Sequence, residues 1–192
     1  MATTRIVLVP DGARVPGLLD IYGLPPEVVA NPTMSVNGMV GISRLVTASR
    51  LKSLGPYDML YTSRSARTAD TVSVISLALD RDFRSLMQLT IPANKEGETI
   101  TIHPGFQPTD NVGYQRSALE FVGLVFDLHR NKTILAVTHL PMIAGLIGHS
   151  KGIVDDTGLA ALMRDPSLIR FGFGIVETSD GETVKVLSGP TD

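Results

Sequence analysis

The sequence of 192 residues contains no cysteine and no tryptophan, and it has no excess of either charge sign. Without cysteine the chain has no disulfide, no thiolate nucleophile and no cysteine-ligated metal. Its 17 basic and 19 acidic side chains give a formal net charge of -2, so we expect no general affinity for nucleic acid or for an anionic membrane. An anion that binds this chain must therefore be held by a local pocket.

Long apolar runs are also missing. The run Ile6–Val9 is too short for the core of a signal peptide, and no other run approaches the length of a transmembrane helix. The four histidines show no close pairing, so they give no metal-binding signature. We expect a cytoplasmic protein with no membrane association, no metal and no cofactor. The length suits a single domain over residues 1–192 and is short for two domains.

Apolar patterns predict strands that alternate with helices. Short apolar runs typical of buried strands occur four times, at Arg5–Val9, Asp58–Thr62, Leu86–Ile91 and Ile134–Thr138. Helical spacing is present in residues 38–54, in residues 63–79, in the chain that begins at Gly113, and after Pro141. Residues 92–112, rich in Gly, Pro, Asn and Thr, are interpreted as a lid or excursion.

The C-terminal part of the chain carries a hairpin signal. Arg170–Glu177 and Thr183–Leu187 flank a Ser-Asp-Gly-Glu turn. Combined with the alternating strands and helices, this predicts an α/β fold. We expect a three-layer α/β/α sandwich with a mainly parallel sheet of about six strands and a C-terminal hairpin.

Polar residues follow three of the predicted strands directly. Asp11 and Gly12 follow the first strand, Ser63 and Arg67 follow the second, and His139 follows the fourth. In open parallel sheets, ligands bind outside the carboxyl ends of the strands. We therefore expect these five residues to meet at one edge of the sheet.

Four segments of the chain match a known series of motifs in order and spacing. Residues 8–12, Leu-Val-Pro-Asp-Gly, correspond to Leu-Val-Arg-His-Gly, and residues 34–38, Met-Ser-Val-Asn-Gly, to Leu-Thr-x-x-Gly. Residues 62–67, with Thr71 in the following helix, are similar to a Ser-Ser-Pro-Leu-x-Arg-Ala segment, and residues 137–141 to Val-Ser-His-Gly-Gly. In this series the chain resembles the histidine phosphatase superfamily, which includes the phosphoglycerate mutases.

The resemblance implies a set of roles for the matching residues. In the family, the first-motif His attacks the phosphoryl group, two Arg and a second His hold the phosphate oxygens, and an acidic residue protonates the leaving group. This chain retains Arg67 and His139, but Asp11 stands at the nucleophile and Pro10 at the first-motif Arg. No carboxylate lies in residues 83–88, where the acid is expected, and the nearest substitutes are Glu96 and Glu98.

The acidic side chain at position 11 changes the electrostatics of the implied pocket. Two like unit charges about 4 Å apart repel by roughly 4 kcal/mol at an effective dielectric constant near 20, which corresponds to about a thousandfold loss of phosphate affinity at the upper end. Asp11 has two interpretations. It is either a substitute nucleophile that forms an acyl phosphate, or a carboxylate that pairs with Arg67 or His139 across a vestigial pocket.

These observations lead to three hypotheses about function. The first is a degenerate histidine phosphatase that binds a small phosphorylated or other anionic ligand, or a protein partner, through Arg67 and His139, with Gly12 and Ser63 as further phosphate contacts. The alternative is an active phosphomonoesterase or phosphomutase in which Asp11 or His103 attacks, or in which His139 activates a water molecule. The third is an interaction module whose pocket is filled by the lid around residues 92–112 and by Leu140, Pro141 and Met142, which replace the family's small glycines.

Overall fold

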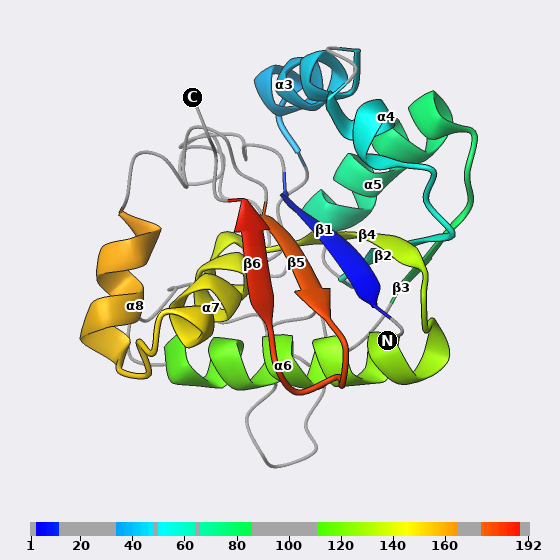
Figure 1. Cartoon of the computed structure of the whole chain (residues 1–192). Helices are drawn as coiled ribbons and strands as arrows, with labels where there is room; N and C mark the ends of the chain where they lie inside the picture. The colour runs from blue at the N-terminus through cyan, green and yellow to red at the C-terminus, as the bar shows by residue number, and fades with distance from the viewer. Residues whose placement is uncertain are drawn as a thin grey trace, which may run out of the picture.

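The computed structural model describes residues 3–11, 34–47, 50–63, 66–85, 111–164 and 174–188. The strands are β1 (Thr4–Pro10), β2 (Met59–Thr62), β3 (Phe83–Ser85), β4 (Thr133–Thr138), β5 (Gly174–Thr178) and β6 (Lys185–Ser188). The helices are α3 (Val36–Thr47), α4 (Arg50–Leu54), α5 (Ala66–Leu79), α6 (Asn111–Leu128), α7 (Leu140–Ser150) and α8 (Asp156–Met163). Figure 1 shows their arrangement.

The strands form one six-stranded sheet in the order β3-β2-β4-β1-β5-β6. The pairs β1 with β4, β4 with β2, and β2 with β3 are parallel, whereas β5 runs antiparallel to β1 and pairs with β6 in the predicted C-terminal hairpin. The register places Pro10 beside Thr138 and Thr62 beside Val137. The carboxyl ends of β1, β4 and β2 are therefore level at one edge of the sheet.

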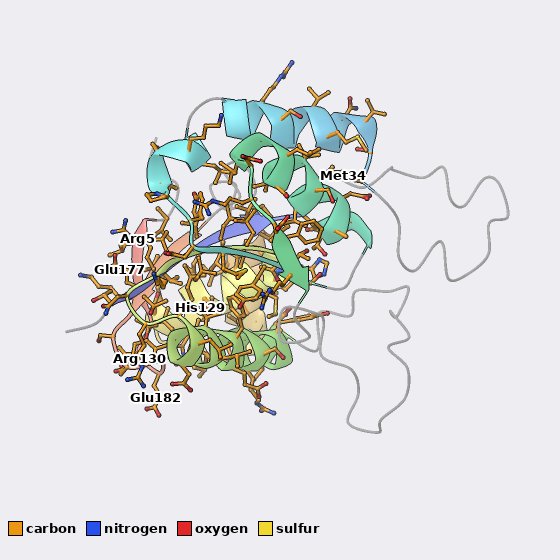
Figure 2. All side chains as sticks on the ribbon, turned by 90° about the vertical axis from the view of Figure 1, so that its right-hand side faces the viewer. Arg5, Met34, His129, Arg130, Glu177 and Glu182 are labelled. Atoms are coloured by element: carbon orange, nitrogen blue, oxygen red, sulfur yellow. The ribbon has the colours of Figure 1, made fainter. Side chains whose placement is uncertain are left out.

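Helices cover both faces of the sheet (Figure 2), with α3, α4 and α5 on one side and α6 on the other. Alternate residues of each central strand belong to different cores. Ile6 and Leu8 of β1 pack in the core that contains residues of α6 and α7, whereas Val7 and Val9 pack in the core that contains residues of α3, α4 and α5. Because both faces of β1 are buried, its sequence is a continuous apolar run. The three-layer α/β/α architecture is as predicted.

Two predicted elements have different boundaries in the structure. The helix expected over residues 38–54 is divided into α3 and α4, and α3 begins two residues early because the Ser35 Oγ accepts a hydrogen bond from the Gly38 N–H at 3.0 Å. The third strand lies at Phe83–Ser85, just before the predicted Leu86–Ile91, which falls outside the described residues. Residues 92–110 of the predicted lid also lie outside the described residues. The last two residues of that segment, 111 and 112, belong to helix α6, which begins at Asn111.

Helix α8 has no counterpart in the sequence prediction. Its first turn is capped by Asp155, whose side chain accepts a hydrogen bond from the Gly158 N–H at 2.9 Å. Asp156 reaches across to the start of α6, where its Oδ1 accepts from the Asn111 N–H at 2.8 Å and from the Val112 N–H at 3.2 Å. Among the helices described, none combines the length and the apolar character that crossing a membrane requires.

Candidate functional site

The strand-end cluster, as we name Asp11, Ser63, Arg67, Thr68 and His139, lies at the carboxyl edge of the sheet. Backbone hydrogen bonds extend the pairing of β1 with β4, and that of β2 with β4, by one residue each. The Asp11 N–H donates to the Thr138 carbonyl at 2.9 Å, and the Ser63 N–H donates to the Val137 carbonyl at 3.2 Å. Both residues are thereby fixed against the end of β4, one residue before His139.

One oxygen of Asp11 contacts both Arg67 and His139. The Arg67 Nε donates a hydrogen bond to Asp11 Oδ2, and His139 Nδ1 lies 3.1 Å from the same oxygen. The side chains of Asp11 and His139 are 9% and 7% exposed, whereas that of Arg67 is 24% exposed. The carboxylate thus lies between the two groups that the family resemblance assigns to phosphate binding.

The second nitrogen of the His139 ring faces the end of β2. Nε2 lies 3.3 Å from Ser63 Oγ, and Ser63 Oγ lies 2.6 Å from Thr68 Oγ1 on α5. Thr68 Oγ1 is also within 3.3 Å of the Ser63 carbonyl. Both ring nitrogens of His139 therefore have polar partners, Asp11 on one side and Ser63 on the other.

The helices that follow the strands hold the cluster in place. His139 precedes α7 with extended backbone angles, φ -92° and ψ 149°, and Pro141 occupies the first turn, where its missing N–H costs nothing. On α5, the Thr71 hydroxyl donates to the Arg67 carbonyl at 2.7 Å. The Asp70 carboxylate accepts from the Met34 N–H at 3.0 Å, which ties the segment before α3 to α5.

The structure brings together four of the five predicted site residues, namely Asp11, Ser63, Arg67 and His139. Gly12, together with His103 and the two candidate acids at positions 96 and 98, lies outside the described residues. Thr68 was not among the predicted residues, because a threonine in the first turn of a helix carries no sequence signal of its contact with Ser63.

The large side chains at positions 140 and 141 lie at the start of α7. Leu140 is half-buried, and Pro141 is buried. Within the described ranges, no three acidic or histidine side chains gather as a metal-ligand set. The chemistry available at the cluster is therefore that of a carboxylate, a guanidinium, an imidazole and two hydroxyls.

No protein-family model matches the sequence, and no curated protein matches it. Solved structures do. A histidine-to-alanine mutant of phosphoserine phosphatase from Entamoeba histolytica, in complex with phosphoserine, is 15% identical with a TM-score of 0.65, over 98% of this chain and 97% of that chain. Phosphoglycerate mutase from Plasmodium falciparum is 13% identical with a TM-score of 0.57, over 98% of this chain and 91% of that chain.

A mycobacterial glucosyl-3-phosphoglycerate phosphatase is also similar, with 12% identity and a TM-score of 0.62, over 98% of this chain and 99% of that chain. These neighbours belong to the histidine phosphatase superfamily, and they match almost the whole chain. At such identities the likeness establishes the fold. The chain has the phosphoglycerate mutase-like fold, as its motifs predicted.

Proposed function

We propose that this protein is a degenerate histidine phosphatase that has no phosphohistidine chemistry and binds a small phosphorylated or other anionic ligand at the strand-end cluster. The proposal rests on one observation. The carboxylate of Asp11, at the position of the family's nucleophile, contacts both Arg67 and His139. A negatively charged group that belongs to the chain thus lies where the family holds the negatively charged phosphoryl group.

This arrangement weakens anion binding without abolishing it. Arg67 uses Nε for Asp11, and among the described residues its two terminal amino groups have no hydrogen-bond partner. A guanidinium with free terminal groups binds carboxylate or phosphate oxygens in a bidentate manner. Because the Arg67 side chain is 24% exposed, these groups are the natural contact for a ligand.

A structural neighbour supports binding without the full set of histidines. The similar phosphoserine phosphatase from Entamoeba histolytica is a histidine-to-alanine mutant in complex with phosphoserine. That protein shows that this fold holds a phosphomonoester when one histidine is missing. Phosphomonoesters and carboxylates are the ligands to screen against the present chain. A protein partner that presents such a group satisfies the same chemistry.

The alternative is an active phosphomonoesterase or phosphomutase with rewired chemistry. Attack by Asp11 requires its carboxylate to leave Arg67 and His139, the two donors that stabilise its negative charge. Activation of a water by His139 requires Nε2 to exchange Ser63 for that water. Both steps sacrifice contacts that the folded chain makes, so the geometry favours the binding function.

Thermal melts in inorganic phosphate and an assay with an aryl phosphate test the proposal together. We expect millimolar phosphate to raise the melting temperature of the wild-type protein and of an Arg5→Ala control, whose arginine pairs with Glu177 on β5. The shift is expected to vanish in Arg67→Ala. None of the three proteins is expected to hydrolyse the aryl phosphate or to retain labelled phosphate.

Either of two results would overturn this account. Hydrolysis by the wild type that disappears in Arg67→Ala would establish a working phosphatase and favour the alternative. A phosphate-dependent shift that survives in Arg67→Ala would place the anion elsewhere on the protein.

A further inference from the structure

We infer that Ser63, His139 and Asp11 form a nucleophile–base–carboxylate relay that hydrolyses carboxylic esters. This activity is separate from the phosphate binding proposed above. It uses the hydroxyl of Ser63 in place of the missing histidine nucleophile. The three residues come from the ends of three different strands, and the order of their contacts carries the inference.

The hydroxyl, the imidazole and the carboxylate are in contact in the order that acyl transfer requires. Ser63 Oγ lies 3.3 Å from His139 Nε2, and Nδ1 of the same ring lies 3.1 Å from Asp11 Oδ2. In a Ser-His-Asp triad, one ring nitrogen takes the proton of the serine while the carboxylate on the other nitrogen fixes the tautomer and stabilises the imidazolium. Here the hydroxyl and the carboxylate occupy those two sides of the ring.

The place of Ser63 in the fold also suits a nucleophile. It follows β2 directly, and α5 begins three residues later at Ala66. Nucleophilic serines of α/β hydrolases occupy a comparable strand-to-helix turn at the carboxyl edge of a parallel sheet. The positive end of the α5 dipole is therefore near the point where negative charge develops on the substrate oxygen.

Arg67 and Thr68 prepare two members of the relay. The Arg67 Nε donates to Asp11 Oδ2, which holds the carboxylate in place beside His139 Nδ1. Thr68 Oγ1 lies 2.6 Å from Ser63 Oγ and donates to the Ser63 carbonyl at 3.3 Å, so Thr68 contacts both the side chain and the backbone of Ser63 and holds the residue in position. The terminal groups of Arg67 favour an ester whose acyl or alcohol part carries a negative charge.

The reaction proceeds in two balanced steps. Ser63 Oγ attacks the carbonyl carbon while Nε2 takes its proton, and the ester C–O bond breaks as the imidazolium returns that proton to the departing alcohol. Nε2 then takes a proton from water, the hydroxide attacks the acyl group on Ser63, and the acid leaves as the serine recovers its proton. No metal, cofactor or redox partner is required.

A fluorophosphonate probe tests the nucleophile in the full-length protein. We expect one covalent adduct, formed with loss of fluoride and mapped by mass spectrometry to Ser63. Ser63→Ala should remove it, and His139→Ala should slow its formation by about a hundredfold or more. Ser73→Ala is the matched control, since the Ser73 hydroxyl donates to the Ala69 carbonyl along α5, and it should label like the wild type. Labelling that survives Ser63→Ala overturns the inference.

Ser63 is fully buried, so access has to be measured as well as reactivity. Because the chain has no cysteine, Ser63→Cys introduces a single thiol whose alkylation by iodoacetamide reports on this position alone. We expect alkylation of the folded protein, and we expect it to slow at least about tenfold when His139→Ala is added, because the imidazolium favours the thiolate. A thiol that reacts only in denaturant, or one indifferent to His139, overturns the relay.

These tests are independent of the proposed binding function. The phosphate response is a comparison of the wild type with Arg67→Ala, whereas labelling is a comparison of the wild type with Ser63→Ala. Labelling that depends on Ser63 in a wild type without a phosphate response would therefore support the relay alone. Loss of the phosphate response in Arg67→Ala concerns the binding function alone.

Discussion

Asp11 Oδ2 lies 3.1 Å from His139 Nδ1 and accepts a hydrogen bond from the Arg67 Nε through the same oxygen. Asp11 follows β1, His139 follows β4, and Arg67 lies in the first turn of α5. The side chain of Asp11 is 9% exposed. A buried carboxylate held by two donors joins three elements of the fold. This contact is thus expected to stabilise the protein.

Removing this charge should destabilise the fold when no anion is present. Asp11→Asn leaves Arg67 and His139 without their carboxylate. A hydrogen bond to a charged group contributes about 1.5–3 kcal/mol to the free energy of unfolding. Since Arg67 is partly exposed, we expect a loss of about 1–3 kcal/mol in the free energy of unfolding by urea. The control Asp127→Asn breaks a surface pair with Arg130 and should cost less than about 0.5 kcal/mol. Equal losses in the two variants would contradict a structural role for Asp11.

Gly145 should be essential to the packing of α7 on α6. A Cβ at this position would lie 2.7 Å from Gln115 Cα, which is backbone that side-chain rotation cannot move. The Gln115 amide donates to the Gly145 and Ile153 carbonyls at 3.0 Å and 2.9 Å, so the two helices are fixed at close range. We expect Gly145→Ala to lower the free energy of unfolding by about 1–3 kcal/mol in urea titrations.

A second glycine offers the matched control. Gly41 lies within α3, and a Cβ there would have no neighbour within 4 Å. Gly41→Ala should stabilise the protein by about 0.5–1 kcal/mol, because alanine loses less conformational freedom in a helix. Destabilisation by both substitutions would show that the contact with Gln115 is not the cause.

His129 should make the stability of the protein sensitive to acid. His129 follows α6, and its Nε2 lies 2.6 Å from the Tyr61 hydroxyl on β2. Burial lowers the pKa of His129 below 6.5. The Asp58 carboxylate partly opposes this change, whereas Arg84 and Lys132 reinforce it. The folded protein therefore holds this proton less tightly than the unfolded chain. The contribution of His129 to stability is complete above the pKa that it has in the unfolded chain. It is lost as the pH falls through the pKa that it has in the folded protein.

The comparison of wild type with His129→Gln isolates this contribution. Unfolding by urea is measured at about pH 7.5 and about pH 5.5, on either side of the ordinary histidine pKa. We expect the wild type to lose more stability on acidification than the variant, which keeps a polar group beside Tyr61 but does not titrate. Parallel losses in the two proteins would show that His129 does not contribute to the acid response.

The fold was predictable because its signals are local and repeated. Ile6–Val9 is apolar at every position because both faces of β1 are buried, and the α6 pattern of Ala118, Phe121, Val122 and Val125 lies in one core. The split between α3 and α4 and the short helix α8 were missed because neither has a long periodic pattern. The start of α8 depends on a single capping side chain, that of Asp155.

The site was predictable only in part. The positions of Asp11, Ser63, Arg67 and His139 at strand ends follow from the order of the elements, so their convergence is confirmed by the structure. Sequence alone left open whether Asp11 pairs with Arg67 or with His139, and the structure shows that it contacts both. The pairing of Ser63 with His139 and Thr68 depends on side-chain directions that no motif records.

Calorimetric titration of inorganic phosphate into wild type and Asp11→Asn tests most directly whether Asp11 takes the place of a bound anion. If the carboxylate competes with the ligand for Arg67 and His139, its removal should tighten phosphate binding by about 10- to 1,000-fold, the range that the repulsion between like charges at close range allows. An affinity that is unchanged or weaker in Asp11→Asn would contradict the account, because it would mean that phosphate does not bind between these two groups.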